Sequence, residues 1–98
     1  MSKPEYVYFI QCGDGGPIKI GLSRDPAARL QALQTSCPYP LVLLCAYRIR
    51  TPNVIGRRVE GNLHAMFVAT RLSGEWFLPT EALLKEIEHW ADCEATTP

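Results

Sequence analysis

Two short apolar segments on either side of a glycine-rich turn constrain the fold most strongly. Residues 6–10 (Tyr-Val-Tyr-Phe-Ile) are aromatic or β-branched, and residues 18–20 (Ile-Lys-Ile) alternate apolar with polar. Both patterns are typical of strands. The segment between them, Gly13 to Pro17, holds three glycines and a proline. The sequence therefore predicts a β-hairpin whose loop is somewhat longer than the tightest type.

The rest of the chain predicts helices and one further strand. Ser23 or Asp25 can cap a helix over residues 27–33, with Pro26 in its first turn. Residues 41–49 form an apolar run of strand length, and residues 71–78 favour a loop or short strand. Apolar residues at three- and four-residue steps predict two more helices. The first of these opens at Thr51-Pro52, and its apolar positions are Ile55, Val59, Leu63, Met66 and Phe67. The second follows Thr80, and its apolar positions are Leu83, Leu84, Ile87, Trp90 and Ala91.

The predicted element order is β-β-α-β-α-α, which indicates an α+β fold. We expect a small antiparallel three-stranded sheet flanked by helices. The chain has 98 residues, of which 47% are hydrophobic and 20% charged. This length and composition fit one globular domain over residues 1–98, with a core of about residues 6–92 and a disordered tail at 93–98.

No apolar run reaches the length that a membrane span needs, which is roughly 20 residues. The longest run, Leu41 to Tyr47, has the length of a strand. The first five residues do not resemble a signal peptide. We therefore expect a cytoplasmic protein that does not bind membranes.

The four cysteines lack the CxxC spacing of a zinc site. Because nothing argues for export, we interpret Cys12, Cys37, Cys45 and Cys93 as free thiols, mostly buried.

The charge is unevenly distributed although the chain is neutral overall. Residues 19–71 hold eight cationic residues against two acidic ones, a net charge of +6, whereas residues 75–98 hold one against six, a net charge of −5. Seven of the eight cations are arginine, which suits bidentate phosphate contacts. This asymmetry favours a phosphate-binding face, although an ordinary solvated surface has similar weight.

The order of the elements and four residues placed in them resemble the GIY-YIG endonuclease superfamily. Tyr8 stands at the tyrosine of the first motif, Lys19 replaces the second tyrosine, Arg29 matches the helical arginine, and Glu60 matches the metal-binding glutamate. The match covers about residues 6–78. A further set of residues resembles small phage and bacterial members: Glu60-Gly61-Asn62-Leu63-His64, Phe67, Arg71 and Gly74-Glu75-Trp76-Phe77. Neither motif is literal, and no residue near Trp76 matches the late asparagine of many members.

This resemblance implies a metal-dependent endonuclease that hydrolyses DNA phosphodiester bonds. Glu60 would hold a single Mg²⁺ or Mn²⁺, since such ions prefer a carboxylate and water molecules as ligands. Tyr8 would orient or deprotonate the attacking water, with Lys19 supplying a positive field or taking the proton. Arg29 would neutralise phosphate charge. His64, one turn after Glu60, would assist the leaving group or fill a partly buried position.

Each candidate residue also has a structural interpretation. Glu60 could pair with Arg57 at the surface, Tyr8 could be a core aromatic, and Lys19 and Arg29 could simply face solvent. Among the remaining candidates, Trp76 and Phe77 are expected to pack under the final helix rather than stack on bases. Glu75 is a weaker candidate, as a carboxylate outside the immediate metal site. His89, on the acidic last helix, is expected to lie at the plain surface.

Three functions are compatible with these residues. The first is the nuclease, and the alternative is a catalytically weak or inactive nucleic-acid-binding module with the same fold. The third is a protein-interaction domain that uses the acidic final helix. The sequence indicates nucleic acid, in particular DNA, as the partner; a homo-oligomer or a partner protein is compatible with the sequence but not indicated by it.

Overall fold

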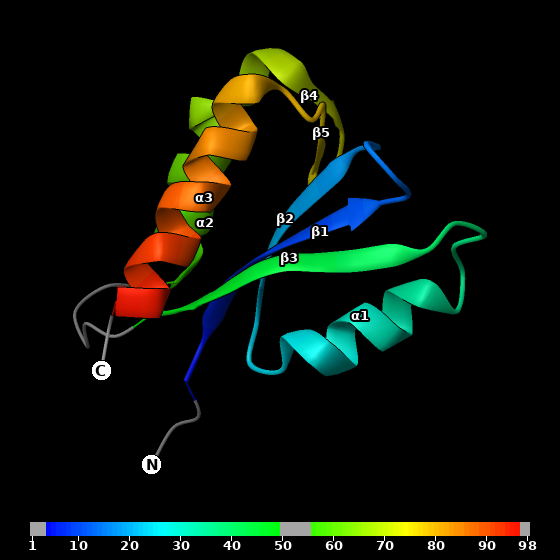
Figure 1. Ribbon diagram of the computed structural model, residues 1–98, viewed down its shortest axis with the longest axis horizontal. Coiled ribbons are helices and arrows are strands. Elements are labelled where there is room, and N and C mark those ends of the chain that lie inside the picture. Colours follow the sequence, from blue (N-terminus) through cyan, green and yellow to red (C-terminus); the bar gives the residue numbers. More distant parts are fainter. Residues whose placement is uncertain (1–3, 50–55, 97–98) are drawn as a thin grey trace.

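A computed structural model describes residues 4–49 and 56–96 of the chain (Figure 1). Five strands form one antiparallel sheet in the order β3-β1-β2-β5-β4. The elements are β1 (Tyr6–Cys12), β2 (Ile18–Ser23), α1 (Pro26–Gln34), β3 (Leu41–Arg48), α2 (Gly56–Met66), the 3₁₀ turn η1 (Val68–Thr70), β4 (Arg71–Ser73), β5 (Trp76–Phe77) and α3 (Glu81–Thr96).

The predicted α+β class and N-terminal hairpin are confirmed, but the sheet has five strands rather than three. Residues 71–77, expected to form a loop or short strand, form the β4–β5 hairpin. Gly74, at φ +55°, supplies the left-handed conformation that its tight turn requires. β5 extends the sheet because Ile18 pairs with Phe77 and Lys19 with Trp76.

The two faces of the sheet are covered by different helices. In Figure 1, α1 lies on one side of the strands, and α2 and α3 lie together on the other. Successive strand residues point to opposite faces. The larger core, on the side of α2 and α3, therefore contains alternate residues of β1 and β2, namely Val7, Phe9, Ile18 and Ile20. They pack with Leu63, Phe67, Phe77, Leu83 and Ile87. The smaller core, on the α1 side, contains Tyr8, Ile10 and Leu41, with Leu30, Leu33 and Trp76 packed against them.

The expectation that Trp76 and Phe77 both pack under the final helix is correct for Phe77 only. Phe77 is fully buried in the same core as Leu83 of α3. Trp76 packs with the Tyr8 core on the other face. Because the two residues are neighbours in one strand, they cannot face the same way.

The predicted helix caps are present where the structure describes them. Asp25, rather than Ser23, caps α1, with its Oδ1 accepting from the Ala28 N–H at 3.1 Å, and Pro26 occupies the first turn. Thr80 Oγ1 accepts from the Leu83 N–H at 3.2 Å and caps α3.

The predicted helix limits and apolar faces differ in part from the structure. The expected start of the second helix, at Thr51-Pro52 with Ile55, lies outside the described residues. α3 continues to Thr96, whereas a disordered tail was predicted from residue 93. Two positions of the predicted apolar faces, Met66 and Leu84, are 60% and 41% exposed, so those faces are narrower than the sequence pattern suggested. Over the described residues, no helix has the length and apolar character needed to cross a membrane.

Candidate functional site

The hydroxyl end of Tyr8 lies over Gly21 of the neighbouring strand. The two residues are cross-strand partners, and the Tyr8 side chain is almost completely buried. A Cβ atom placed on Gly21 would stand 2.3 Å from Tyr8 Cζ and 2.3 Å from its Oη. No side chain other than hydrogen fits at position 21 while the ring keeps this place. Gly21 therefore sets the position of the phenol.

Burial raises the pKa of Tyr8 to about 12. The carboxylates of Glu75 and Glu60 raise this pKa as well, while the Arg29 guanidinium opposes them. The phenol is consequently protonated at neutral pH and acts as a hydrogen-bond donor. Three charged residues from three separate segments, Glu75, Glu60 and Arg29, therefore act electrostatically on one hydroxyl group.

Two carboxylates and an imidazole converge beside this hydroxyl. Glu60 and His64 lie one turn apart on α2, and Glu75 belongs to the β4–β5 turn. One potential ligand atom from each of the three lies within 4.8 Å of the other two, and all three side chains are partly buried. We refer to Glu60, His64 and Glu75 as the acidic cluster.

The main chain of Ile20 holds two segments of the acidic cluster together. Its N–H donates to the Glu75 carbonyl at 2.9 Å, and its carbonyl accepts from His64 Nε2 at 2.9 Å. Because a carbonyl only accepts, Nε2 carries a proton, and Nδ1 is the nitrogen left to act as a ligand when the ring is neutral. The His64 ring also lies 5.1 Å from the Phe77 ring, which limits its rotation. A backbone carbonyl that fixes the tautomer in this way is common behind metal-binding histidines.

Lys19 supplies the positive charge next to the acidic cluster. Its Nζ lies 2.9 Å from Glu75 Oε1, and its side chain is only 14% exposed. The same Nζ lies 5.7 Å from the centre of the Trp76 ring. Lys19 thus points toward the site instead of facing solvent, and Glu75 has a larger part in the arrangement than the sequence indicated.

Burial also raises the pKa of Glu60, and the nearby carboxyl group of Glu75 raises it further. His64 and Lys19 act in the opposite direction. Arg57, the surface partner considered for Glu60, is exposed and is not among these neighbours. Two converging carboxyl groups repel each other unless a proton or a cation lies between them. With an imidazole nitrogen added, this donor set fits a divalent cation.

We expect the raised pKa of Glu60 to make the metal-free protein less stable as pH rises. A carboxyl group that binds its proton more tightly when folded favours folding at low pH. Its contribution is lost as pH rises from the ordinary value of about 4.5 through the higher folded value. Thermal unfolding in a chelator from pH 4 to 8 should show this loss. Glu60→Gln should flatten that part of the profile, whereas exposed Glu88→Gln should not; equal slopes in all three proteins would contradict the assigned environment.

The structure brings Tyr8, Lys19, Glu60 and His64 to one location, with Arg29 close enough to influence the Tyr8 phenol. Arg29 itself is exposed on α1, where its backbone N–H donates to the Asp25 carbonyl at 3.0 Å. From the sequence, Glu75 is only a weak candidate, and Gly21 is not predicted to position the phenol. Signals for both were present: Gly74 marks a turn next to Glu75, and the hairpin register pairs Gly21 with Tyr8.

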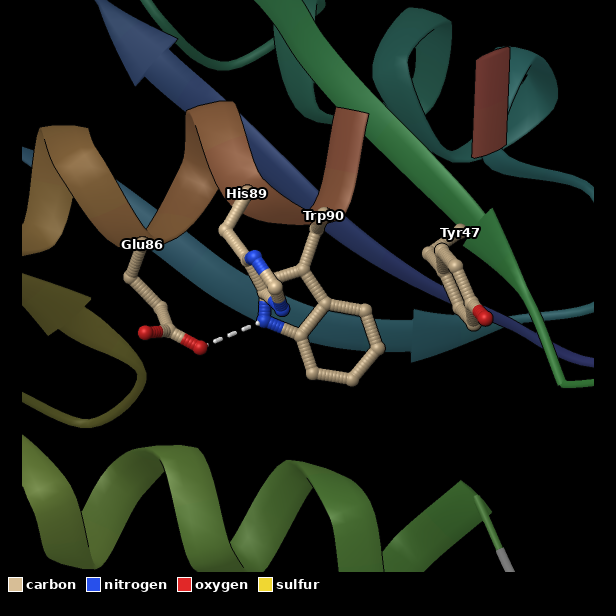
Figure 2. A pocket seen from close by; sticks show the side chains of 4 residues that line it. All are labelled: Tyr47, Glu86, His89 and Trp90. Carbon is tan, nitrogen blue, oxygen red and sulfur yellow. Dashed lines mark hydrogen bonds between the residues drawn. The ribbon is translucent and has the colours of Figure 1, made fainter. Parts of the chain in front are cut away.

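A separate pocket lies between α3 and β3 (Figure 2). Tyr47 of β3 and Glu86, His89 and Trp90 of α3 line this space of about 240 Å³. The Trp90 Nε1–H donates to Glu86 Oε2 at 2.8 Å, and the Tyr47 ring meets the indole edge-on at 4.6 Å. His89 is exposed, as expected from the sequence, and it also lines this pocket. Tyr47 pairs with Val7, which points away from Tyr8, so the pocket is not part of the Tyr8 site.

Comparison with known proteins identifies one family. The model of the T5orf172 domain matches residues 5–93, nearly the whole chain. No curated protein and no solved structure matches. The assignment to the GIY-YIG superfamily, made from the two strand motifs, Arg29 and Glu60, is corrected by this result, because the family that matches is T5orf172. The short motifs that suggested the other superfamily were not literal in this sequence.

Proposed function

The chain belongs to the T5orf172 domain family, a family of nuclease-like, DNA-binding domains, and on this premise we propose that it is a metal-dependent nuclease. The reaction would be hydrolysis of a DNA phosphodiester bond at the Tyr8 site. One observation carries the proposal: Tyr8, Lys19 and the acidic cluster meet at one place, with Arg29 acting on the same hydroxyl.

Phosphodiester hydrolysis requires an oriented water, neutralisation of phosphate charge and a stabilised leaving oxygen. Glu60, His64 and Glu75 would hold Mg²⁺ or Mn²⁺, which supplies Lewis acidity toward a phosphate oxygen. Carboxylates suit both ions, and the imidazole of His64 favours Mn²⁺ over Mg²⁺. The second possible role of His64, assistance to the leaving group, is less compatible with a ring whose Nε2–H is bound to Ile20.

The remaining side chains would bind and orient the substrate. With its pKa raised to about 12, Tyr8 is a poor base, so its hydroxyl would orient water or phosphate by donating a hydrogen bond. Lys19, paired with Glu75, would keep that carboxylate in place and add positive charge beside the phosphate. Arg29 is exposed on α1, so its guanidinium is accessible to a phosphate that approaches the Tyr8 face.

The second candidate is a nucleic-acid-binding module without turnover. If turnover required Tyr8 as the base, the burial that raises its pKa would favour this module over the nuclease. Lys19 and Arg29 would then bind phosphate groups, and affinity would fall steeply with salt.

A plasmid-cleavage assay separates the two functions. Wild-type protein is expected to nick supercoiled DNA with Mn²⁺, and less efficiently with Mg²⁺, but not with chelator. Arg29→Ala should lower the initial rate by about 100-fold or more, the usual effect of removing one group that stabilises developing charge. Lys85→Ala is the matched control, because Lys85 is exposed on α3 and paired with Glu81.

Intact plasmid under every metal condition would reject the nuclease proposal. If a salt-dependent gel shift persists under those conditions, the binding module is selected. Unchanged cleavage by Arg29→Ala would show that Arg29 is not part of the site. The metal requirement is tested separately, by the reaction with chelator.

A further inference from the structure

The thiols of Cys12 and Cys37 lie in contact at the end of the molecule where β1 stops and the α1–β3 connection turns back. Their Sγ atoms are 3.7 Å apart, although the residues are 25 positions apart in sequence. Both side chains are partly exposed. They border the smaller core that contains Tyr8 and Leu41. The acidic cluster does not include them, so the proposed nuclease chemistry leaves this pair without a role.

Hydrogen bonds to the main chain fix both segments that carry these thiols. Gln34 Nε2 donates to the Cys37 carbonyl at 3.2 Å and to the Tyr39 carbonyl at 2.9 Å, while its Oε1 accepts from the Leu41 N–H at 2.8 Å. The N–H of Gly13, directly after Cys12, donates to the Pro40 carbonyl at 2.8 Å. The connection is therefore attached both to α1 and to the end of β1.

A disulfide requires only a small further approach of the two sulfurs. The bond length is about 2.0 Å, so the Sγ atoms must close by about 1.7 Å from their present 3.7 Å. Rotation about the side-chain bonds of partly exposed residues can supply a movement of this size. Because the folded chain already holds the thiols together, the closure is an intramolecular reaction with a high effective concentration.

We propose that Cys12 and Cys37 form a redox modification site that closes to an intrachain disulfide under mild oxidation by a peroxide. One thiolate attacks the peroxide, giving a sulfenic acid and, from hydrogen peroxide, one water. The second thiol then displaces the hydroxyl group from sulfur as a second water while the S–S bond forms. Two thiols are oxidised and one peroxide is reduced. A dithiol reductant reverses the bond by exchange.

The geometry lets either thiol act as the resolving partner. Burial raises the pKa of Cys12, and its hydrogen bond with Cys37 and the proximity of that thiol raise it further. Thiolate, not thiol, attacks peroxide. Whichever sulfur is oxidised first, the other lies 3.7 Å away and can resolve the sulfenic acid. The completed bond would join the α1–β3 connection to the end of β1. It would therefore link α1 covalently to the strand that carries Tyr8.

The decisive experiment uses the full chain with the other two cysteines replaced, Cys45→Ala/Cys93→Ala. After limited hydrogen peroxide, we expect an intact mass lower by two hydrogen atoms, a monomer on a non-reducing gel, and one Cys12–Cys37 cross-linked peptide. The unfolding temperature should rise by roughly 10 to 20 °C, because the bond closes a loop of about 25 residues. Dithiothreitol should reverse both changes.

Single variants separate this site from random thiol oxidation. Cys12→Ser and Cys37→Ser in the same background should each retain a sulfenic acid on the remaining thiol, which a dimedone probe captures, and neither should form the intrachain cross-link. Peptide mapping of the oxidised wild type supplies the same information if a variant fails to fold. Sulfinic acid on either residue without a cross-link, or cross-links found only between two chains, would overturn the proposal. These readouts do not depend on nuclease activity.

Discussion

Replacing Glu60 with glutamine should reduce metal-dependent cleavage by about 100- to 1000-fold, the range found when one group that stabilises the transition state is removed. Glutamine keeps the size of the side chain but is a weak ligand for a divalent cation. Glu60 is partly buried between Glu75 and His64, so its charge acts at short range within the acidic cluster. Mn²⁺ affinity, measured by calorimetry, should fall in parallel with the cleavage rate.

The fold of this variant should remain intact. Removing one of two repelling carboxyl groups should leave the metal-free unfolding temperature at neutral pH equal to that of the wild type or higher. Glu88→Gln, on the exposed side of α3, is the matched control and should change neither Mn²⁺ affinity nor cleavage. Normal Mn²⁺ binding by Glu60→Gln would show that the ion does not bind at this cluster, even if activity were lost for another reason.

Gly21→Ala is expected to have the largest effect on stability of any single-methyl substitution in the Tyr8 site. The new Cβ would stand 2.3 Å from the Tyr8 ring and hydroxyl, far inside van der Waals contact. Overpacking of this kind costs about 1 to 3 kcal/mol. In a domain of this size the unfolding temperature should fall by roughly 5 to 20 °C. Because Tyr8 must move away, cleavage should fall as well, even at temperatures where the variant is folded.

Gly61→Ala is a matched control because no atom lies within 4 Å of a Cβ placed on Gly61, which is on α2 one residue after Glu60. Alanine is the better helix former, so this variant should be more stable than the wild type by up to about 1 kcal/mol. Calorimetry on both proteins tests the contrast. Equal unfolding temperatures for the two variants would mean that the Tyr8 ring adapts to a side chain at position 21.

The sequence was sufficient to predict the parts of the site that depend on local pattern. Aromatic and β-branched residues in the first strand, alternation in the second and the glycine-rich turn between them predicted the hairpin. Its register places Tyr8, Lys19 and Gly21 on one face. The four-residue spacing of Glu60 and His64 on a helix predicted that they share a side. In each case the periodicity of the element fixes the direction of the side chain.

The position of Glu75 could not be predicted in the same way. β4 and β5 contain only three and two residues, too few for an alternating pattern to be distinguished from a loop. Their place in the sheet depends on pairing with β2, a contact between segments almost sixty residues apart. The same pairing decides which face of the sheet the Trp76 side chain lies on. The prediction that Trp76 packs under the final helix was wrong for this reason. The contact between His64 and Ile20, 44 residues apart, has no sequence signal at all.

The attachment of two site segments to the main chain of Ile20 has a consequence for how this domain can change over evolution. The groups that hold His64 and the Glu75 carbonyl are a backbone carbonyl and a backbone N–H, which every residue except proline provides. The side chain at position 20 is therefore free to vary with the core, within the limits of packing, while the support for the site is inherited unchanged. A library that randomises position 20 should tolerate many apolar residues and exclude proline. Mutations can then change the proposed ligand residues of the acidic cluster one by one, because the backbone groups of residue 20 that support them are retained.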